Sequence, residues 1–185
     1  AGEYQPGWML LSYGKKVSVS SSLEGYPAEN IVDEDARTAW VAQSNRDMEW
    51  AQVDLQRLSS IHAIQVNFDE YGANQKGAVS GVYQSYLIYA SVNGEDWSLV
   101  VDYGTKKTDT PHDYIEFEEP FKARYIKLQN KEYMVSENFS VRDLRIFGKG
   151  QGSTPRAVND FTVERDEADP CKARLCWEAV PDAQG

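Results

Sequence analysis

Three consecutive acidic residues, Asp33, Glu34 and Asp35, stand between an apolar pair and a tryptophan. Adjacent carboxylates repel one another unless solvent or a cation screens them. Pro27 and the short polar residues near it predict an irregular loop here instead of a helix. Side-chain oxygens at Asp33, Asp35 and Thr38, with backbone carbonyls between them, can surround a hard cation such as Ca²⁺. A solvated acidic turn is the alternative. An EF-hand is excluded, because its glycine and distal glutamate are absent.

The residues that hydrolytic mechanisms require do not occur in a matching arrangement. Glycoside hydrolysis needs two carboxylates facing each other across a cleft, whereas most acidic residues here fall in turns or alternate outward on predicted strands. No Ser-His-Asp order with nucleophile-elbow glycines is present. The two histidines, His62 and His112, are too few for a catalytic zinc site. The sequence therefore predicts a noncatalytic protein.

Composition limits the partners of the chain. Its net charge of −10 argues against nucleic acid, which needs a basic surface, and against electrostatic docking to anionic lipid. No apolar run approaches the length of a membrane span, so membrane insertion is not expected. The 11 tyrosines and 5 tryptophans suit a β-rich protein with a binding surface. Both cysteines, Cys171 and Cys176, lie in the C-terminal tail, so the fold is not expected to depend on disulfides.

Hydrophobic periodicity predicts an all-β protein. Residues 64–68 alternate apolar and polar side chains, as a half-buried strand does, and no segment keeps a period of 3.6. A glycine-containing segment without periodicity, residues 69–84, predicts a long loop of the kind that often carries function. Trp40, Trp50 and Trp97 flank predicted strands and are expected in the core. Further strands are predicted at residues 17–20, 86–91, 98–103, 114–118, 125–129 and 141–147.

Five motifs in order resemble the coagulation factor 5/8 type C family, whose discoidin-like fold is also classed among carbohydrate-binding modules of family 32. The motifs are residues 17–22, 26–55, 89–97, 123–128 and 143–148. The resemblance covers roughly residues 10 to 150. It implies an eight-stranded jelly-roll β-sandwich.

The resemblance also implies a structural calcium ion. In the family the ligands match the carbonyl of Asn30, the side chains of Asp33, Asp35 and Thr38, and an acidic residue of the last strand, here Asp143. Two positions depart from the family pattern. Glu34 replaces the usual glycine, and the last-strand ligand is more often glutamate.

A third implication is a glycan site on the loops at one end of the sandwich. Sugars are held by aromatic faces and planar polar groups in a shallow site. The matching loops are residues 23–26, 43–47, 69–84 and 132–138. The candidate ligand-binding residues are Asn45, Arg46, Tyr71, Asn74, Tyr83 and Tyr133.

The chain is predicted to divide into a binding domain, residues 1–149, a Gly/Ser/Pro linker, residues 150–155, and a tail, residues 156–185. Residues 1–14 are expected to pack on the domain as an N-terminal arm. The tail resembles the first two strands of a fibronectin type III domain, with Trp177 in place of its core tryptophan. A β-hairpin docked on the binding domain is the alternative.

The leading hypothesis from the sequence is a noncatalytic carbohydrate-binding module that accompanies the catalytic domain of a bacterial glycoside hydrolase in one longer polypeptide. The ligand would be a glycan, and the location extracellular, periplasmic or at the cell surface, as the family implies. A ligand-free spacer is one alternative. A discoidin-type domain for cell-surface or lipid adhesion is another, although the loop tips, residues 44–47 and 74–76, are polar.

Overall fold

The computed structural model describes residues 7–73, 81–150, 161–166, 169 and 171–177. The chain divides into two compact units, Ala1–Gln151 and Gly152–Gly185. The elements of the first unit are β1 (Met9–Leu10), β2 (Lys16–Val19), a 3-10 helix η1 (Ala28–Val32), β3 (Trp40–Val41), β4 (Trp50–Phe68), β5 (Gln84–Ser91), β6 (Ser98–Tyr103), β7 (His112–Tyr133) and β8 (Ser140–Gly150). The second unit contains β9 (Thr162–Arg165) and β10 (Ala173–Cys176).

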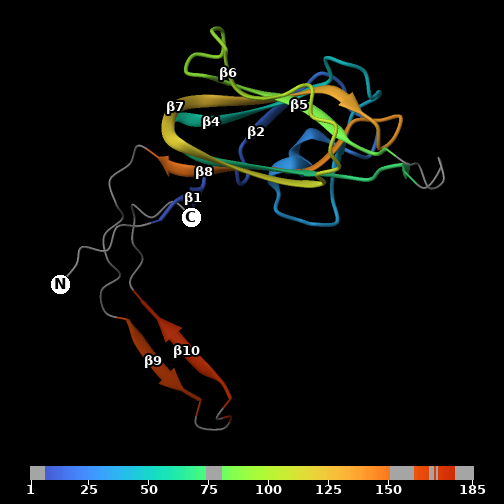
Figure 1. Ribbon diagram of the computed structural model, residues 1–185. Helices are drawn as coiled ribbons and strands as arrows, with labels where there is room; N and C mark the ends of the chain where they lie inside the picture. Colours follow the sequence, from blue (N-terminus) through green and yellow to red (C-terminus); the bar gives the residue numbers. More distant parts are fainter. Residues whose placement is uncertain (1–6, 74–80, 151–160, 167–168, 170, 178–185) are drawn as a thin grey trace. The chain divides into compact units, whose positions relative to one another are not determined.

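The strands of the first unit form two layers, because β4 and β7 bend and run through both (Figure 1). All pairings are antiparallel, in the order β1-β8-β4-β7-β5-β6, with β2 beside β4 and β3 beside β8. One layer contains β6, β5, the second half of β7, the first half of β4 and β2. The other layer contains the first half of β7, the second half of β4, β8, β1 and β3. The predicted β-sandwich is thereby confirmed.

Strand β7 corrects one expectation from the sequence. Two separate strands were predicted at residues 114–118 and 125–129, but they belong to one continuous strand. Glu116 pairs with Ala63 and Phe121 pairs with Ile61, so residues 117–120 lie at the bend without ladder partners. Pro120 lies within this stretch, where its missing N–H leaves no ladder bond unmade.

The core between the layers is rich in aromatic rings. Phe68 contacts Tyr86, Tyr133 and Phe139 with ring centroids 5.3, 6.0 and 6.1 Å away, and Trp40 meets Phe139 at 5.7 Å. Trp40 is fully buried, as expected. Trp50, the first residue of β4, and Trp97, which lies in the turn just before β6, are only half-buried. Such rings bury large apolar areas and hold the strands that carry the loops.

Residues 8–10 of the predicted N-terminal arm contact the sandwich, and residues 1–6 of the arm lie outside the described residues. Strand β1 pairs with Phe147 and Gly148 of β8, and the Trp8 ring stacks on His62 at a centroid distance of 5.0 Å. Gly148 is required here, because a Cβ atom would lie 2.0 Å from the carbonyl oxygen of Ser60.

The second unit contains an antiparallel hairpin. Val163 pairs with Leu175, and Phe161 and Trp177 lie on the same face by strand alternation. These four side chains are between 52% and 57% exposed. The resemblance to fibronectin type III and the domain boundaries remain predictions.

Candidate functional site

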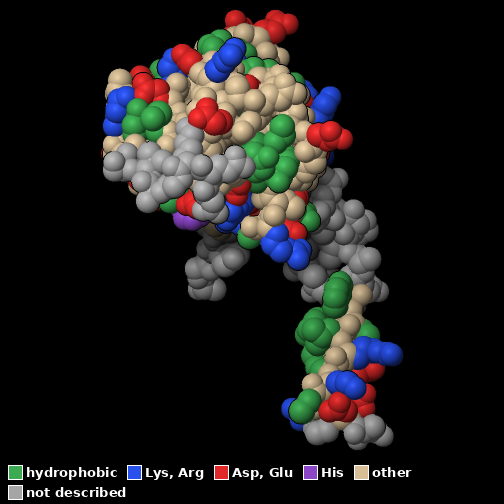
Figure 2. Space-filling view, turned by 90° about the vertical axis from the view of Figure 1, so that its right-hand side faces the viewer, with side chains coloured by type: hydrophobic (Ala, Val, Ile, Leu, Met, Phe, Trp, Pro, Cys, Tyr) green, Lys and Arg blue, Asp and Glu red, His purple; other side chains and the backbone are tan. Residues whose placement is uncertain are grey.

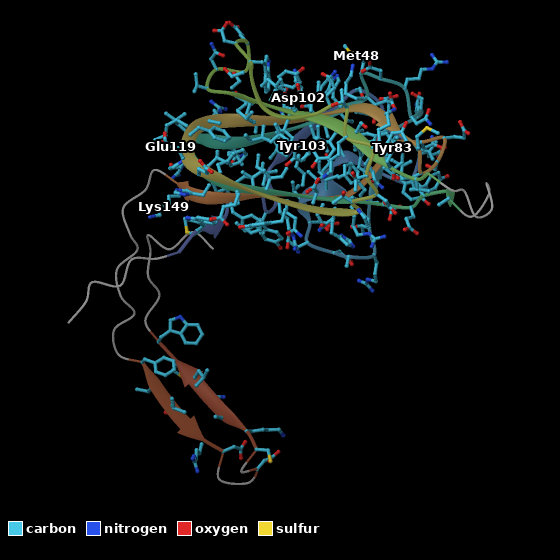
Figure 3. All side chains as sticks on the ribbon, viewed as in Figure 1. Met48, Tyr83, Asp102, Tyr103, Glu119 and Lys149 are labelled. Atoms are coloured by element: carbon cyan, nitrogen blue, oxygen red, sulfur yellow. The ribbon has the colours of Figure 1, made fainter. Side chains whose placement is uncertain are left out.

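Loops from distant parts of the chain meet at one end of the sandwich. The Phe139 N–H donates to the Ser44 carbonyl, and the Met134 N–H donates to the Tyr83 carbonyl. The Leu23 N–H donates to the carbonyl of Val41 in β3, which holds the loop of residues 23–26 beside that strand. Figure 3 shows Met48 and Tyr83 toward this end, and Glu119 and Lys149 at the opposite end. We call it the loop end, made of residues 23–26, 43–49, 69–73, 81–83 and 132–139.

The loop of residues 43–49 is fixed by two asparagine side chains. Asn130, which is fully buried, donates from Nδ2 to the carbonyls of Asn45 and Arg46 over 2.8 and 2.9 Å. Asn45 in turn donates from Nδ2 to the carbonyls of Tyr133 and Ser136, over 3.3 and 2.8 Å. Asn45 was predicted to contact ligand. Its amide donor is instead engaged in holding the loop.

Glu49 closes the base of this loop. Its carboxylate accepts hydrogen bonds from the hydroxyls of Ser20, Ser21 and Ser44. Burial raises the pKa of this carboxyl, but the three hydroxyl donors outweigh burial and leave the pKa below its usual value. Glu49 is therefore ionised at neutral pH and gives the loop a rigid base.

Arg46 projects from this fixed loop into solvent. Its backbone is held on both sides, because its N–H donates to Ser44 Oγ and its carbonyl accepts from Asn130. Its guanidinium makes no hydrogen bond or ion pair with any side chain in the described part of the chain. An arginine with a fixed backbone can donate two parallel hydrogen bonds from its planar guanidinium to a carboxylate or to two hydroxyls.

Met48 is an apolar residue at the tip of the same loop, and sequence reasoning missed it. It is 64% exposed and has a φ of 83°, a backbone conformation that is strained for a side chain of this size. The tip was expected to be polar. It therefore presents an arginine and an apolar side chain together.

Tyr83 belongs to a charged cluster that sequence reasoning did not find. Its hydroxyl donates to Glu132 over 2.5 Å, while Lys107 donates to the Tyr83 hydroxyl over 2.9 Å and forms an ion pair with Glu132. The Lys107 ammonium also lies 4.6 Å from the centroid of the Tyr83 ring. The three residues come from separate strands and loops, so no local motif marks them.

The other candidate residues have different surroundings. Tyr71 is half-buried and packs edge-on against Tyr26, with centroids 4.9 Å apart. Asn74 lies outside the described residues. Tyr133 was predicted to be a stacking platform, but it is only 2% exposed and its hydroxyl donates to the Asp69 carbonyl. A ring in the core cannot stack on a sugar, so Tyr133 is corrected to a residue that anchors the loops.

Figure 2 shows the loop end face-on. Acidic, basic and hydrophobic side chains are interspersed on the face that it draws.

The acidic loop after η1 brings several oxygen atoms together. Asp33 Oδ2 lies 2.8 Å from Thr38 Oγ1, which in turn lies 2.9 Å from the Asp35 carbonyl oxygen. The second carboxylate oxygen of Asp33 accepts from the Asp35 N–H over 2.9 Å. Hard oxygen donors at this spacing fit the chemistry that calcium prefers.

Two carboxylates of the predicted metal set are engaged elsewhere. The Asp35 carboxylate is gripped by Arg37 over 2.8 and 3.0 Å, and this hydrogen bonding holds the pKa of Asp35 at about 2. The Asp143 carboxylate accepts from Asn67 over 2.8 Å. The Asn30 side-chain amide donates to the Ala39 carbonyl, a bond that does not involve the Asn30 backbone carbonyl predicted as a ligand. Within the described residues no three His, Cys, Asp or Glu side chains gather around one point. A calcium ion here would depend on carbonyl and hydroxyl oxygens as well.

The comparison with family models decides the family. The model described as F5/8 type C domain matches residues 16–144. The chain belongs to the F5/8 type C family. The fold of this family is that of a binding module and not of a catalytic domain.

Relatives agree with this membership. Lactadherin from Rattus norvegicus is 33% identical over 110 residues, which are 56% of this chain and 25% of that protein. Lactadherin from Mus musculus is 32% identical over 110 residues, 56% of this chain and 23% of that protein. The chain thus spans about a quarter of the length of the curated relatives it matches.

Solved structures share the fold. Chitosan-binding module 1 of a chitosanase/glucanase from Paenibacillus sp. IK-5 superposes with a TM-score of 0.63 at 20% identity, covering 76% of this chain and 99% of that one. The family 32 module of NanJ from C. perfringens, solved with galactose, gives a TM-score of 0.59 at 19% identity, covering 76% and 98%. None of the helices among the described residues is long and apolar enough to span a membrane.

Proposed function

We propose that this chain is a noncatalytic module that binds a glycan through the loop end. The observation that carries the proposal is the fixed loop of residues 43–49, which presents to solvent an Arg46 guanidinium that has no side-chain partner among the described residues. Tyr71 and Tyr83 supply ring faces at the same end. Solved structures with this fold include modules in complex with galactose and with chitotriose, which supports a sugar as the class of ligand.

We further propose an accessory role beside a catalytic domain, which the same similar structures support. Several of the similar structures come from glycoside hydrolases or carry a lyase domain. The chain would then keep a catalytic domain of the same polypeptide close to its polysaccharide, outside the cell, in the periplasm or at the cell surface. Binding by such a shallow site is weak, with a Kd of roughly 0.1–1 mM.

Substitution of Arg46 tests this site. A glycan array identifies a ligand, and titration calorimetry then compares the wild type with Arg46→Ala. Loss of the guanidinium leaves sugar hydroxyls unpaired and should cost about 1–2 kcal/mol of binding free energy. The melting temperature should hardly change, because the Arg46 side chain is exposed. Arg174→Ala removes an exposed arginine of β10 and serves as the matched control. Unchanged binding in Arg46→Ala, Tyr71→Ala and Tyr83→Ala would contradict the proposal.

We also propose a structural calcium ion at the acidic loop. Asp33, Thr38 and the Asp35 carbonyl would supply the central oxygens, and Asn30 and Asp143 would contribute where the resemblance places them. Such an ion would fix the turn between η1 and β3 and leave the loop end unchanged.

A further inference from the structure

The outer face of the layer with β2, β4, β7, β5 and β6 carries a row of side chains that the loop end does not use. Strand register places Ser18, Gln52, Lys127, Tyr89 and Leu99 side by side, one from each strand. Adjacent strands are about 4.8 Å apart, so the row spans roughly 19 Å. The layer is the one that contains the labels β2, β5 and β6 in Figure 1. We call this row the sheet-face row.

Lys127, at the centre of the row, is held by aromatic rings and by no carboxylate. Its ammonium nitrogen lies 4.1 Å from the centroid of the Trp97 ring and 5.5 Å from that of Tyr89. It makes no hydrogen bond or ion pair with the described residues, and its partial burial lowers the pKa of the amine. Its three N–H donors therefore have no protein acceptor there.

The nearby charges do not neutralise it. The carboxylate of Asp54, two residues from Gln52 on β4, accepts two hydrogen bonds from the Arg124 guanidinium, over 2.8 and 2.9 Å. Asp102 accepts from the Gly104 N–H, and Asp96 accepts from Asn93. In contrast, Lys106, Lys107, Lys131, Arg142 and Arg145 each contact a carboxylate. In a chain with 29 acidic and 19 basic residues, an unpaired and partly buried ammonium stands out.

We propose that the sheet-face row is a second binding site, specific for an acidic sugar such as a uronic acid residue. The sugar carboxylate accepts hydrogen bonds from Lys127. The apolar face of the pyranose ring packs on the exposed edges of Trp97 and Tyr89. Gln52 and Ser18 donate to ring hydroxyls farther along the row. This site goes beyond the proposed function, because it lies on strands and not on loops.

The experiment maps where a defined acidic oligosaccharide binds. Tetragalacturonate is titrated into the ¹⁵N-labelled full chain, and amide and indole N–H shifts are followed by NMR. The fully methyl-esterified tetramer has the same rings without the charge and serves as the control ligand. We expect shifts at Lys127, Tyr89 and the Trp97 indole with the acid, at least tenfold weaker binding of the ester, and weakening of acid binding as salt is added.

Variants separate charge from packing. Lys127→Gln should weaken binding of the acid about tenfold or more, whereas Lys127→Arg should retain most of it. Lys122→Gln removes an exposed lysine from the same strand and should bind as the wild type does. Each variant is first checked for a native spectrum. If Lys127→Gln does not fold, the site is tested by the affinity of Lys127→Arg for the acid and by the affinity of the wild type for the methyl ester.

The outcomes are distinct for the two sites. Shifts confined to residues 43–49 and 69–83 would overturn the sheet-face site while supporting the loop end. Equal binding of acid and ester, or unchanged affinity in Lys127→Gln, would overturn it as well. Shifts on the sheet face, lost in Lys127→Gln but kept in Arg46→Ala, would support it whatever happens at the loop end.

Discussion

Asn130→Asp is the sharpest test of the fixed loop at the loop end. The substitution keeps the shape of the side chain and changes only its amide to a carboxyl. In the wild type the amide Nδ2 donates to the Asn45 and Arg46 carbonyls over 2.8 and 2.9 Å, and the side chain is fully buried. A carboxylate would instead direct negative oxygen atoms at these carbonyls. The loop then loses both bonds and gains a buried charge.

The size of the effect follows from these contacts. Two hydrogen bonds contribute about 1 kcal/mol each, and leaving the buried groups unsatisfied adds about 1–3 kcal/mol. We expect the free energy of unfolding at pH 7 to fall by about 3–5 kcal/mol, a large part of the roughly 5–15 kcal/mol typical of a domain. Gln129→Glu, the neighbour on β7, adds the same charge at a half-exposed position and should cost little.

The deficit should also depend on pH in a defined direction. Burial and the facing carbonyls raise the pKa of the introduced carboxyl above the value of about 3.9 in the unfolded chain. When a carboxyl has a higher pKa in the folded protein than in the unfolded chain, low pH favours the folded state. This contribution to the free energy of unfolding is complete below the unfolded pKa and is lost as the pH rises through the folded pKa. The deficit should therefore be smallest near pH 4 and largest at pH 7, where the carboxyl is ionised.

Urea unfolding of the wild type and both variants between pH 4 and 8 measures this. A deficit below about 1 kcal/mol at pH 7, or one that does not change with pH, would refute the assignment of Asn130 as the residue that fixes the loop. Glycan binding should weaken in parallel, because Arg46 loses its fixed backbone.

Two further predictions concern the metal and the packing of the N-terminal arm. Calcium at 100 times its Kd should raise the free energy of unfolding by about 2.7 kcal/mol relative to EDTA. Asp33→Asn should remove that increase and Glu24→Gln should keep it; no difference between calcium and EDTA in the wild type would exclude the site. Gly148→Ala places a Cβ atom 2.0 Å from the Ser60 carbonyl and should destabilise by at least about 1–3 kcal/mol. In Gly150→Ala the Cβ has no heavy atom within 4 Å and serves as control; equal stability of the two variants in urea would show that β8 is placed wrongly.

Local pattern was sufficient where a segment alone determines its structure. Alternation at residues 64–68 located part of β4, and the turn before Trp97 located the connection between β5 and β6. Pattern failed where partners are distant in sequence. Asn130 lies 85 residues from the carbonyl of Asn45, and Lys107 lies 25 residues from Glu132. A single sequence has no signal that joins such pairs.

Tyr133 shows a second reason for error. Its position beside a predicted end loop suggested an exposed platform, yet its strand turns it inward, where its hydroxyl reaches the Asp69 and Ser140 carbonyls. A tyrosine has both an apolar ring and a polar tip, so composition alone cannot decide whether it anchors a loop or binds a ligand. The burial of the strand face decides, and that depends on register.

The departure at Glu34 connects the acidic loop with β8. Its φ of 60° is the conformation that a glycine would adopt without strain, and for glutamate it costs about 1–2 kcal/mol. The side chain compensates, since Arg145 forks onto it over 3.0 and 2.5 Å in a half-buried pair. This ion pair raises the pKa of Arg145, and Asp143 adds to the effect from nearby. A fixed guanidinium beside Asp143 repels a second cation. Glu34 and Arg145 together therefore hold the acidic loop against β8 by themselves, and the calcium proposed for this loop should bind more weakly than it would beside a glycine at position 34.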